Sequence, residues 1–141
     1  MCIRDRTSIA AGGDLILTDS GGATFGAVNA DAVTLTSTTG TIAFQGVTTF
    51  DTGLTGSADG YNLSFTGGTT TIAGDTNLTH TGTLTLGDGG DTLTFTGGLD
   101  TTGVGGQVNV GGTVGTDGAQ MDLGAITLTA EPAHLMTFIG Q

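Results

Sequence analysis

The chain has 141 residues, among them 28 Gly, and it carries 13 acidic against 2 basic residues, for a formal net charge of −11. Because Lys and Arg must neutralise phosphates, this balance excludes nucleic-acid binding, and no apolar run approaches the roughly 20 residues of a membrane span. The single cysteine, Cys2, provides neither a disulfide framework nor a thiolate metal site.

The first six residues differ in composition from everything that follows. They hold the only Cys and both Arg residues, Arg4 and Arg6, and contain no Gly or Thr. The segment resembles the translated adaptor remnants found at the start of proteins from metagenomic assemblies, the alternative being a genuine short tail. We expect 1–6 to be a non-native remnant, 7–130 to be repeats, and 131–141 to be a truncated next coil or a loop.

From residue 9 onward the chain alternates short apolar–hydroxyl stretches with Gly-, Asp- or Asn-containing turns. A period of two places Leu, Ile, Val and Phe on one face of a strand, and the β-branched Thr between them suits an extended backbone. No 3.6-residue period lasts for ten residues, so essentially no helix is expected. The strands predicted before the sparse region after residue 99 are 15–18, 23–25, 33–36, 41–44, 47–50, 62–66, 70–72, 78–80, 83–86 and 92–96, and 125–129 restores the rhythm.

The strands repeat, and two spacings compete. The segment 62–69 returns at 92–99, thirty positions later, with a weaker copy at 33–37. The segments 41–46, 62–67 and 83–88 are related instead by steps of twenty-one. A strand that cannot bury its apolar face alone can do so by stacking on its own copies, which is how a solenoid forms. The sequence leaves both coil lengths open.

The Leu-Thr-Leu-Thr and Leu-Thr-Phe-Thr runs that end in Gly-Gly or Gly-Asp, together with Phe25-Gly26-Ala27-Val28-Asn29-Ala30, resemble the repetitive passenger regions of filamentous-haemagglutinin-like adhesins and autotransporter "β-strand repeat" exoproteins. The resemblance covers most of 23–129. It implies a right-handed parallel β-helix on a secreted or surface-anchored bacterial protein. We therefore expect an all-β, right-handed parallel β-helix (β-solenoid) fragment.

Asp88 and Asp91 are the metal candidates. The segment 87–93 partly resembles the calcium-binding nonapeptide of RTX β-rolls, in which glycines set the turn and an Asp coordinates calcium. The alternative, which we favour, is a tight turn with two solvated carboxylates. Calcium is accordingly the one cofactor considered.

The second candidate site depends on the thirty-residue coil. With that coil, two parallel columns of hydroxyls would form about 4.7 Å apart along the stack, resembling the flat arrays of ice-binding β-solenoids. The six residues concerned are Thr34, Ser64 and Thr94 in one column and Thr36, Thr66 and Thr96 in the other. The alternative is that Thr is simply a good polar strand residue on an outward face.

No enzyme is expected. Asp88 and Asp91 could be paired carboxylates of a glycoside hydrolase, but Asp is the usual turn residue. Polysaccharide lyases on this fold, by family resemblance, need Arg or Lys, and none follows Arg6. His80 and His134 have no carboxylate at metal-ligand spacing, and no Ser stands in a Gly-x-Ser-x-Gly elbow.

The resulting functional expectation is a rod or spacer segment of a secreted or surface-anchored adhesin-like protein. An ice- or carbohydrate-binding face built from Thr ladders is the alternative. The partners expected are a glycan or host surface reached through the full-length protein, and further copies bound at the open solenoid ends, since unpaired strand edges promote association.

Overall fold

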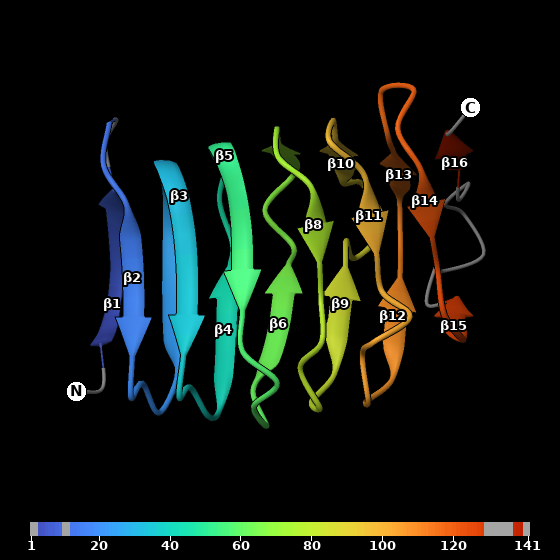
Figure 1. Cartoon of the computed structure of the whole chain (residues 1–141). Coiled ribbons are helices and arrows are strands. Elements are labelled where there is room, and N and C mark those ends of the chain that lie inside the picture. The colour runs from blue at the N-terminus through green and yellow to red at the C-terminus, as the bar shows by residue number, and fades with distance from the viewer. Residues whose placement is uncertain (1–2, 10–11, 129–136, 140–141) are drawn as a thin grey trace.

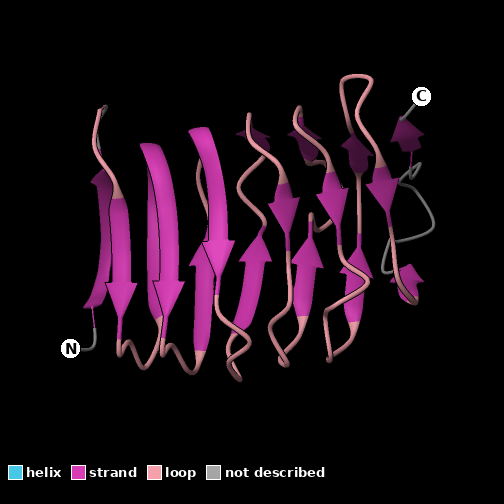
Figure 2. Ribbon diagram, viewed as in Figure 1, coloured by secondary structure: helices cyan, strands magenta, loops and turns pink. Residues whose placement is uncertain are grey.

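The structure is a computed structural model that describes residues 3–9, 12–128 and 137–139. Within these residues all regular structure is β-strand, as Figure 2 shows, and the prediction of an all-β chain with essentially no helix is confirmed. The strands are β1 (Ile3–Ile9), β2 (Leu15–Thr18), β3 (Ala23–Thr36), β4 (Thr41–Phe44), β5 (Thr48–Gly56), β6 (Asn62–Phe65), β7 (Thr69–Ile72), β8 (Thr76–Asn77), β9 (Leu84–Leu86), β10 (Thr92–Phe95), β11 (Leu99–Asp100), β12 (Val108–Val110), β13 (Thr113–Gly115), β14 (Met121–Asp122), β15 (Ile126–Leu128) and β16 (Thr137–Ile139).

The chain winds into a β-solenoid of about six turns, and every strand pairing is parallel. In Figure 1 it rises along the far strands, crosses over, and descends along β2, β8, β11 and β14 while it advances from the N- towards the C-terminus. This is a right-handed winding, as predicted, and it is the hand that parallel β connections almost always adopt.

Each complete turn contributes strands to three faces of the solenoid. The first face consists of the start of β3 followed by β4, β6, β9, β12 and β15. The second consists of the middle of β3, the start of β5, then β7, β10, β13 and β16. The third consists of β2, the ends of β3 and β5, then β8, β11 and β14.

The register decides between the two coil lengths. Leu63 pairs with Ile42 in the preceding turn and with Leu84 in the next. Contacts between equivalent positions of successive turns span 21, 22 or 23 residues. The thirty-residue coil is therefore wrong for this chain. The 62–69 and 92–99 segments resemble each other because both are strands of the same amphipathic type, and they lie on different faces.

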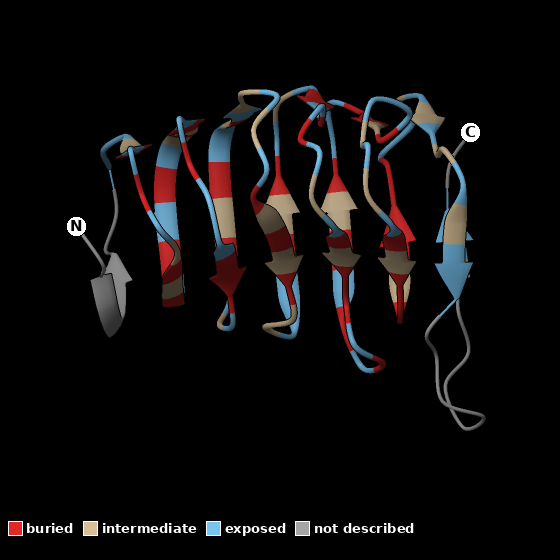
Figure 3. Ribbon diagram, turned by 90° about the horizontal axis from the view of Figure 1, so that it is seen from below, coloured by how far each residue is buried: buried red, intermediate tan, exposed pale blue. Residues whose placement is uncertain are grey.

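The interior is filled by the apolar side chains that alternate along each strand, seen as the buried bands in Figure 3. On the first face Phe25, Phe44 and Phe65 form a continuous ring stack, with centroid separations of 5.2 and 5.0 Å. Phe50 of the second face meets Phe44 edge-on at 5.4 Å. Offset and edge-to-face aromatic pairs of this kind add stabilisation beyond area burial.

The turns between faces bring backbones of successive coils into direct contact. A Cβ on Gly67 would lie 2.2 Å from the carbonyl oxygen of Gly46, and a Cβ on Gly46 would lie 2.5 Å from the backbone nitrogen of Ala27. Only glycine leaves room for this approach. The glycine content therefore reflects coil stacking at the corners as well as turn formation.

Two segments bear on the predicted boundaries. β1, which includes part of 1–6, pairs with β3 as the start of the stack, and whether 1–6 is a non-native remnant stays a prediction. β16 pairs with β13, so 137–139 lies in register as part of a further turn. Residues 129–136, and with them His134, lie outside the described residues.

Candidate functional site

The six hydroxyl residues of the predicted binding face are separated by the 21-residue register. Thr34 pairs with Ile16 and Thr55 on the third face, Ser64 with Ala43 and Thr85 on the first, and Thr94 with Thr71 and Gly115 on the second. The residues named with them are distributed in the same way. Thr36 pairs with Thr18, whereas Thr66 and Thr96 follow the ends of β6 and β10.

The register builds a different threonine array on the second face. In one column Thr69, Thr92, Thr113 and Thr137 are successive Cα partners. Beside it Thr49, Thr71 and Thr94 are partners in the same way, and Gly115 follows Thr94. We call these seven threonines the threonine face. The sequence signal that could have found them is the twenty-one-residue step, applied to all strands rather than to the first-face segments alone.

Asp91 has a structural role in the turn after β9. Its side chain is buried, and its two carboxylate oxygens accept hydrogen bonds from Gly68 N at 2.7 Å and Asp88 N at 2.8 Å. It thereby ties two successive coils together, while the side chain of Asp88 is exposed. In the described part of the chain no group of three or more His, Cys, Asp or Glu side chains is arranged to hold a metal ion.

His80 lies inside the solenoid and is stacked on Tyr61, with ring centroids 4.7 Å apart and an interplanar angle of 22°. Its Nε2 lies 3.3 Å from the carbonyl oxygen of Thr83, whereas His80 Nδ1 and the Tyr61 hydroxyl have no hydrogen-bond partner among the described residues. Burial lowers the pKa of His80, and burial together with the charge of Asp59 raises the pKa of Tyr61 to about 12. Both rings are therefore neutral components of the core.

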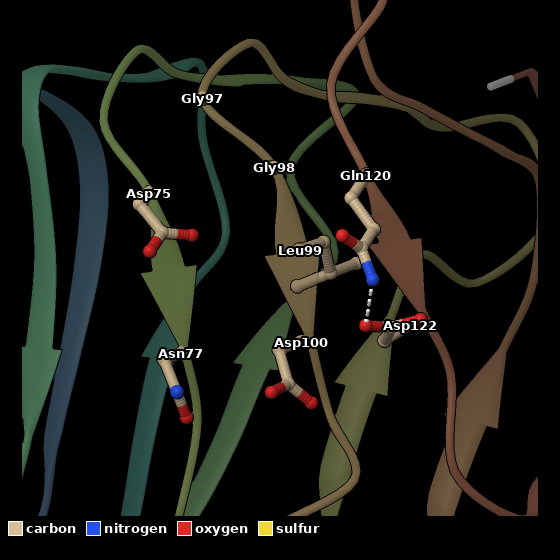
Figure 4. Close-up of a pocket in the computed structure, with 8 residues that line it drawn as sticks. All are labelled: Asp75, Asn77, Gly97, Gly98, Leu99, Asp100, Gln120 and Asp122. Atoms are coloured by element: carbon tan, nitrogen blue, oxygen red, sulfur yellow. Dashed lines mark hydrogen bonds between the residues drawn. The ribbon is translucent and has the colours of Figure 1, made fainter. Parts of the chain in front are cut away.

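The third face carries a polar depression of about 200 Å³ near its C-terminal end, shown in Figure 4. Two rungs of outward side chains line it: Asp75, Gly98 and Gln120 at one level, and Asn77, Asp100 and Asp122 at the next. Strand sequences place Asn77, Asp100 and Asp122 outward because Thr76 and Leu99 alternate with them and face the core.

The carboxylates of this depression are held by neutral donors. Asp100 Oδ1 accepts bonds from the Thr102 amide at 2.8 Å and the Thr102 hydroxyl at 2.6 Å, and these bonds lower the pKa of Asp100. Gln120 donates its side-chain amide to Asp122. A general acid needs a raised pKa so that it holds its proton near neutral pH. Asp100 is shifted in the opposite direction, so this pair lacks the acid of a glycoside hydrolase.

No helix of the described residues is long and apolar enough to cross a membrane. No protein-family model matches this chain, and neither the curated proteins nor the solved structures contain a significant match to it.

Proposed function

We propose that this chain is a structural repeat segment, a rod or spacer, of a secreted or surface-anchored bacterial adhesin-like protein. The observation that supports the proposal is the uninterrupted ladder: on all three faces each strand pairs in parallel with its equivalent in the neighbouring turns. A quasi-one-dimensional stack of this kind extends by a fixed amount per repeat, about 4.8 Å per rung.

The site chemistry agrees with a non-enzymatic role. Asp91 is occupied in tying coils together, and His80 is a neutral core residue. Location on the bacterial surface and partnership with a glycan or host surface through the full-length protein rest on the resemblance of the strand-and-turn pattern to passenger regions. Association of copies at the solenoid ends is part of the same proposal. Leu128, Phe138 and Ile139 of β15 and β16 are exposed, and apolar strand edges invite pairing.

The spacer role can be tested by displaying a fused binding module on cells beyond one or two copies of this chain. We expect a bulky ligand of the module to reach it more readily with two copies, and cells that carry the chain alone not to adhere. Equal access with one and two copies would contradict a rod. Adhesion by the chain alone would show that it is itself the binding element.

A second candidate function, an ice- or carbohydrate-binding face, is favoured by one specific observation. The threonine face provides the two adjacent hydroxyl columns that such a face needs, on seven residues of which only Thr94 belonged to the predicted set. Along each column the rungs are about 4.8 Å apart, and across a strand the two threonines are about 6.7 Å apart. Inhibition of ice recrystallisation by the purified chain tests the ice alternative.

A further inference from the structure

We propose that the threonine face binds a neutral polysaccharide lying along the solenoid axis. The proposal rests on the carbohydrate alternative above and is independent of the rod. It commits to one ligand class, uncharged chains of hydroxylated sugar rings, and to one of the three faces.

The first argument is the availability of the hydroxyl groups. The side-chain hydroxyls of the threonine face make no hydrogen bond to another described residue. On the first face, by contrast, Asn62 links one column internally: its amide donates to Thr41 at 3.4 Å, and its Oδ1 accepts from the hydroxyl of Thr83 at 3.0 Å. Each free threonine hydroxyl can both donate and accept, as sugar hydroxyls require.

The second argument is charge. The chain carries a net charge of −11, yet the outward positions along the second face from residue 47 onward are Val47 and the threonines of the threonine face. The corresponding rungs of the third face hold Asp75, Asp100 and Asp122 instead. A surface without charge in an acidic protein suits an uncharged ligand, because neither partner must give up a hydrated ion on contact.

The third argument is rigidity. Threonine is β-branched, so few rotamers are open to it in a strand, and its methyl and hydroxyl groups are held in place before a ligand arrives. The methyl groups offer apolar contact to the C–H groups of a sugar ring. Pre-ordered side chains reduce the entropy lost on binding. Repeated identical rungs then add weak contacts along a polymer.

The fourth argument separates a sugar chain from a flat crystal surface. At Gly115 the second column lacks a side chain, and a hollow of about 230 Å³ opens there. It is lined by Thr92, Thr94, Thr113, Thr116, Asp117 and Ile139. The hollow is smaller than the roughly 300–1,000 Å³ of typical ligand pockets, so it suits a protruding group of a sugar rather than a whole ligand. A flat lattice would instead need an unbroken column.

The test is retention of the purified full chain on microcrystalline cellulose and on insoluble starch, with alginate beads as the anionic comparison. We expect retention on at least one neutral polymer at both low and high salt, and none on alginate. Thr94→Glu places a charge in the threonine face, and we expect retention to fall by about tenfold because the carboxylate must be desolvated beneath a neutral ligand.

Thr85→Glu is the matched control. Thr85 is likewise a half-buried, outward, mid-strand threonine, but it lies on the first face, and this variant should be retained like the unmodified chain. Circular dichroism would check that both variants keep the β fold. The proposal is overturned by absence of retention on both neutral polymers, by equal loss in the two variants, or by ice recrystallisation inhibition without retention. None of these results bears on the display test of the rod.

Discussion

At the scale of single residues, buried polar side chains in this solenoid mostly satisfy the backbone of neighbouring turns. Thr48 and Thr76 donate their hydroxyls to carbonyl oxygens two residues earlier, and Asp91 accepts two amides. A buried amide left without an acceptor costs roughly 1–3 kcal/mol. These side chains therefore stabilise corners where the ladder itself is interrupted.

Replacing Asp91 should reveal this contribution. Asp91→Ala leaves the amides of Gly68 and Asp88 without their acceptor, and we expect the free energy of unfolding to fall by roughly 1–3 kcal/mol in urea titrations. Asp91→Asn keeps one carbonyl oxygen and should lose less. Asp51→Ala removes an exposed Asp and serves as control. A drop for Asp51→Ala as large as that for Asp91→Ala would show that the two amides are not the cause.

The pair of His80 and Tyr61 predicts a stability plateau between about pH 6.5 and pH 10. The pKa of His80 is lowered from 6.5, so below pH 6.5 the unfolded chain takes up a proton that the folded chain resists, and stability falls as the pH decreases. The pKa of Tyr61 is raised from 10.0 to about 12, so the unfolded chain loses its proton first, and stability falls as the pH rises from 10 towards 12.

Urea midpoints measured across this pH range would check both limbs. Tyr61→Phe removes a hydroxyl that has no partner among the described residues, so it should leave neutral-pH stability equal or higher and weaken the alkaline limb. His80→Phe should weaken the limb just below pH 6.5. An alkaline limb that persists unchanged in Tyr61→Phe would contradict the assignment.

At the scale of elements, the corners set how closely strands of successive coils can stack. Gly46 and Gly67 lie one above the other with their backbones in contact. A side chain there would push two coils apart along the axis and disturb the ladders on either side. The strands themselves tolerate more variation, since core columns mix Phe, Leu, Ile and Val.

Gly67→Ala is accordingly expected to destabilise the chain by roughly 1–3 kcal/mol, the usual cost of overpacking, because its Cβ would meet Gly46 backbone atoms at 2.2–2.6 Å. Gly90→Ala is the matched control, since a Cβ there meets nothing within 4 Å. Thermal unfolding of the two variants measures the difference. Indistinguishable melting temperatures would mean that the coils are not in contact at this corner.

The strand pattern was predictable because its cause is local. Alternation of Leu or Phe with Thr fixes which side chains face inward, and 41–44, 62–65 and 92–95 are strands as expected. The coil length was not, because it depends on which copy each strand meets. Leu63 could pair equally well, by its own sequence, with Leu84 or Leu93. The extension of β3 and β5 around corners was also missed, since Gly26 and Gly53 read as turns but are accommodated within bent strands.

Candidate sites were less predictable for the same reason. A column of outward residues exists only after the register is known, so Thr34, Ser64 and Thr94 were grouped although they lie on three faces. Asp91 was recognised as a turn residue, but its amide donor Gly68 belongs to the preceding coil and no local pattern indicates it. The core position of His80 follows from stacking on Tyr61, which is likewise a contact between coils.

At the scale of the whole molecule, every proposal depends on one quantity, the number of residues per turn. A turn of 21–23 residues creates the threonine face, closes the Phe25–Phe44–Phe65 stack and gives the rod its length per repeat. A thirty-residue turn would dissolve all three and restore the columns headed by Thr34 and Thr36.

Disulfide trapping between outward positions measures this quantity most directly. In a Cys2→Ser background, Ser64→Cys combined with Thr85→Cys places two thiols on neighbouring parallel strands, with Cα atoms about 4.8 Å apart, inside the range that a disulfide spans. We predict rapid intramolecular oxidation of this pair, detected by mass spectrometry of the proteolysed monomer. The pair Ser64→Cys and Thr94→Cys should not oxidise within one molecule, because the two positions lie on different faces. Trapping of the 64–94 pair in place of the 64–85 pair would contradict the 21-residue solenoid.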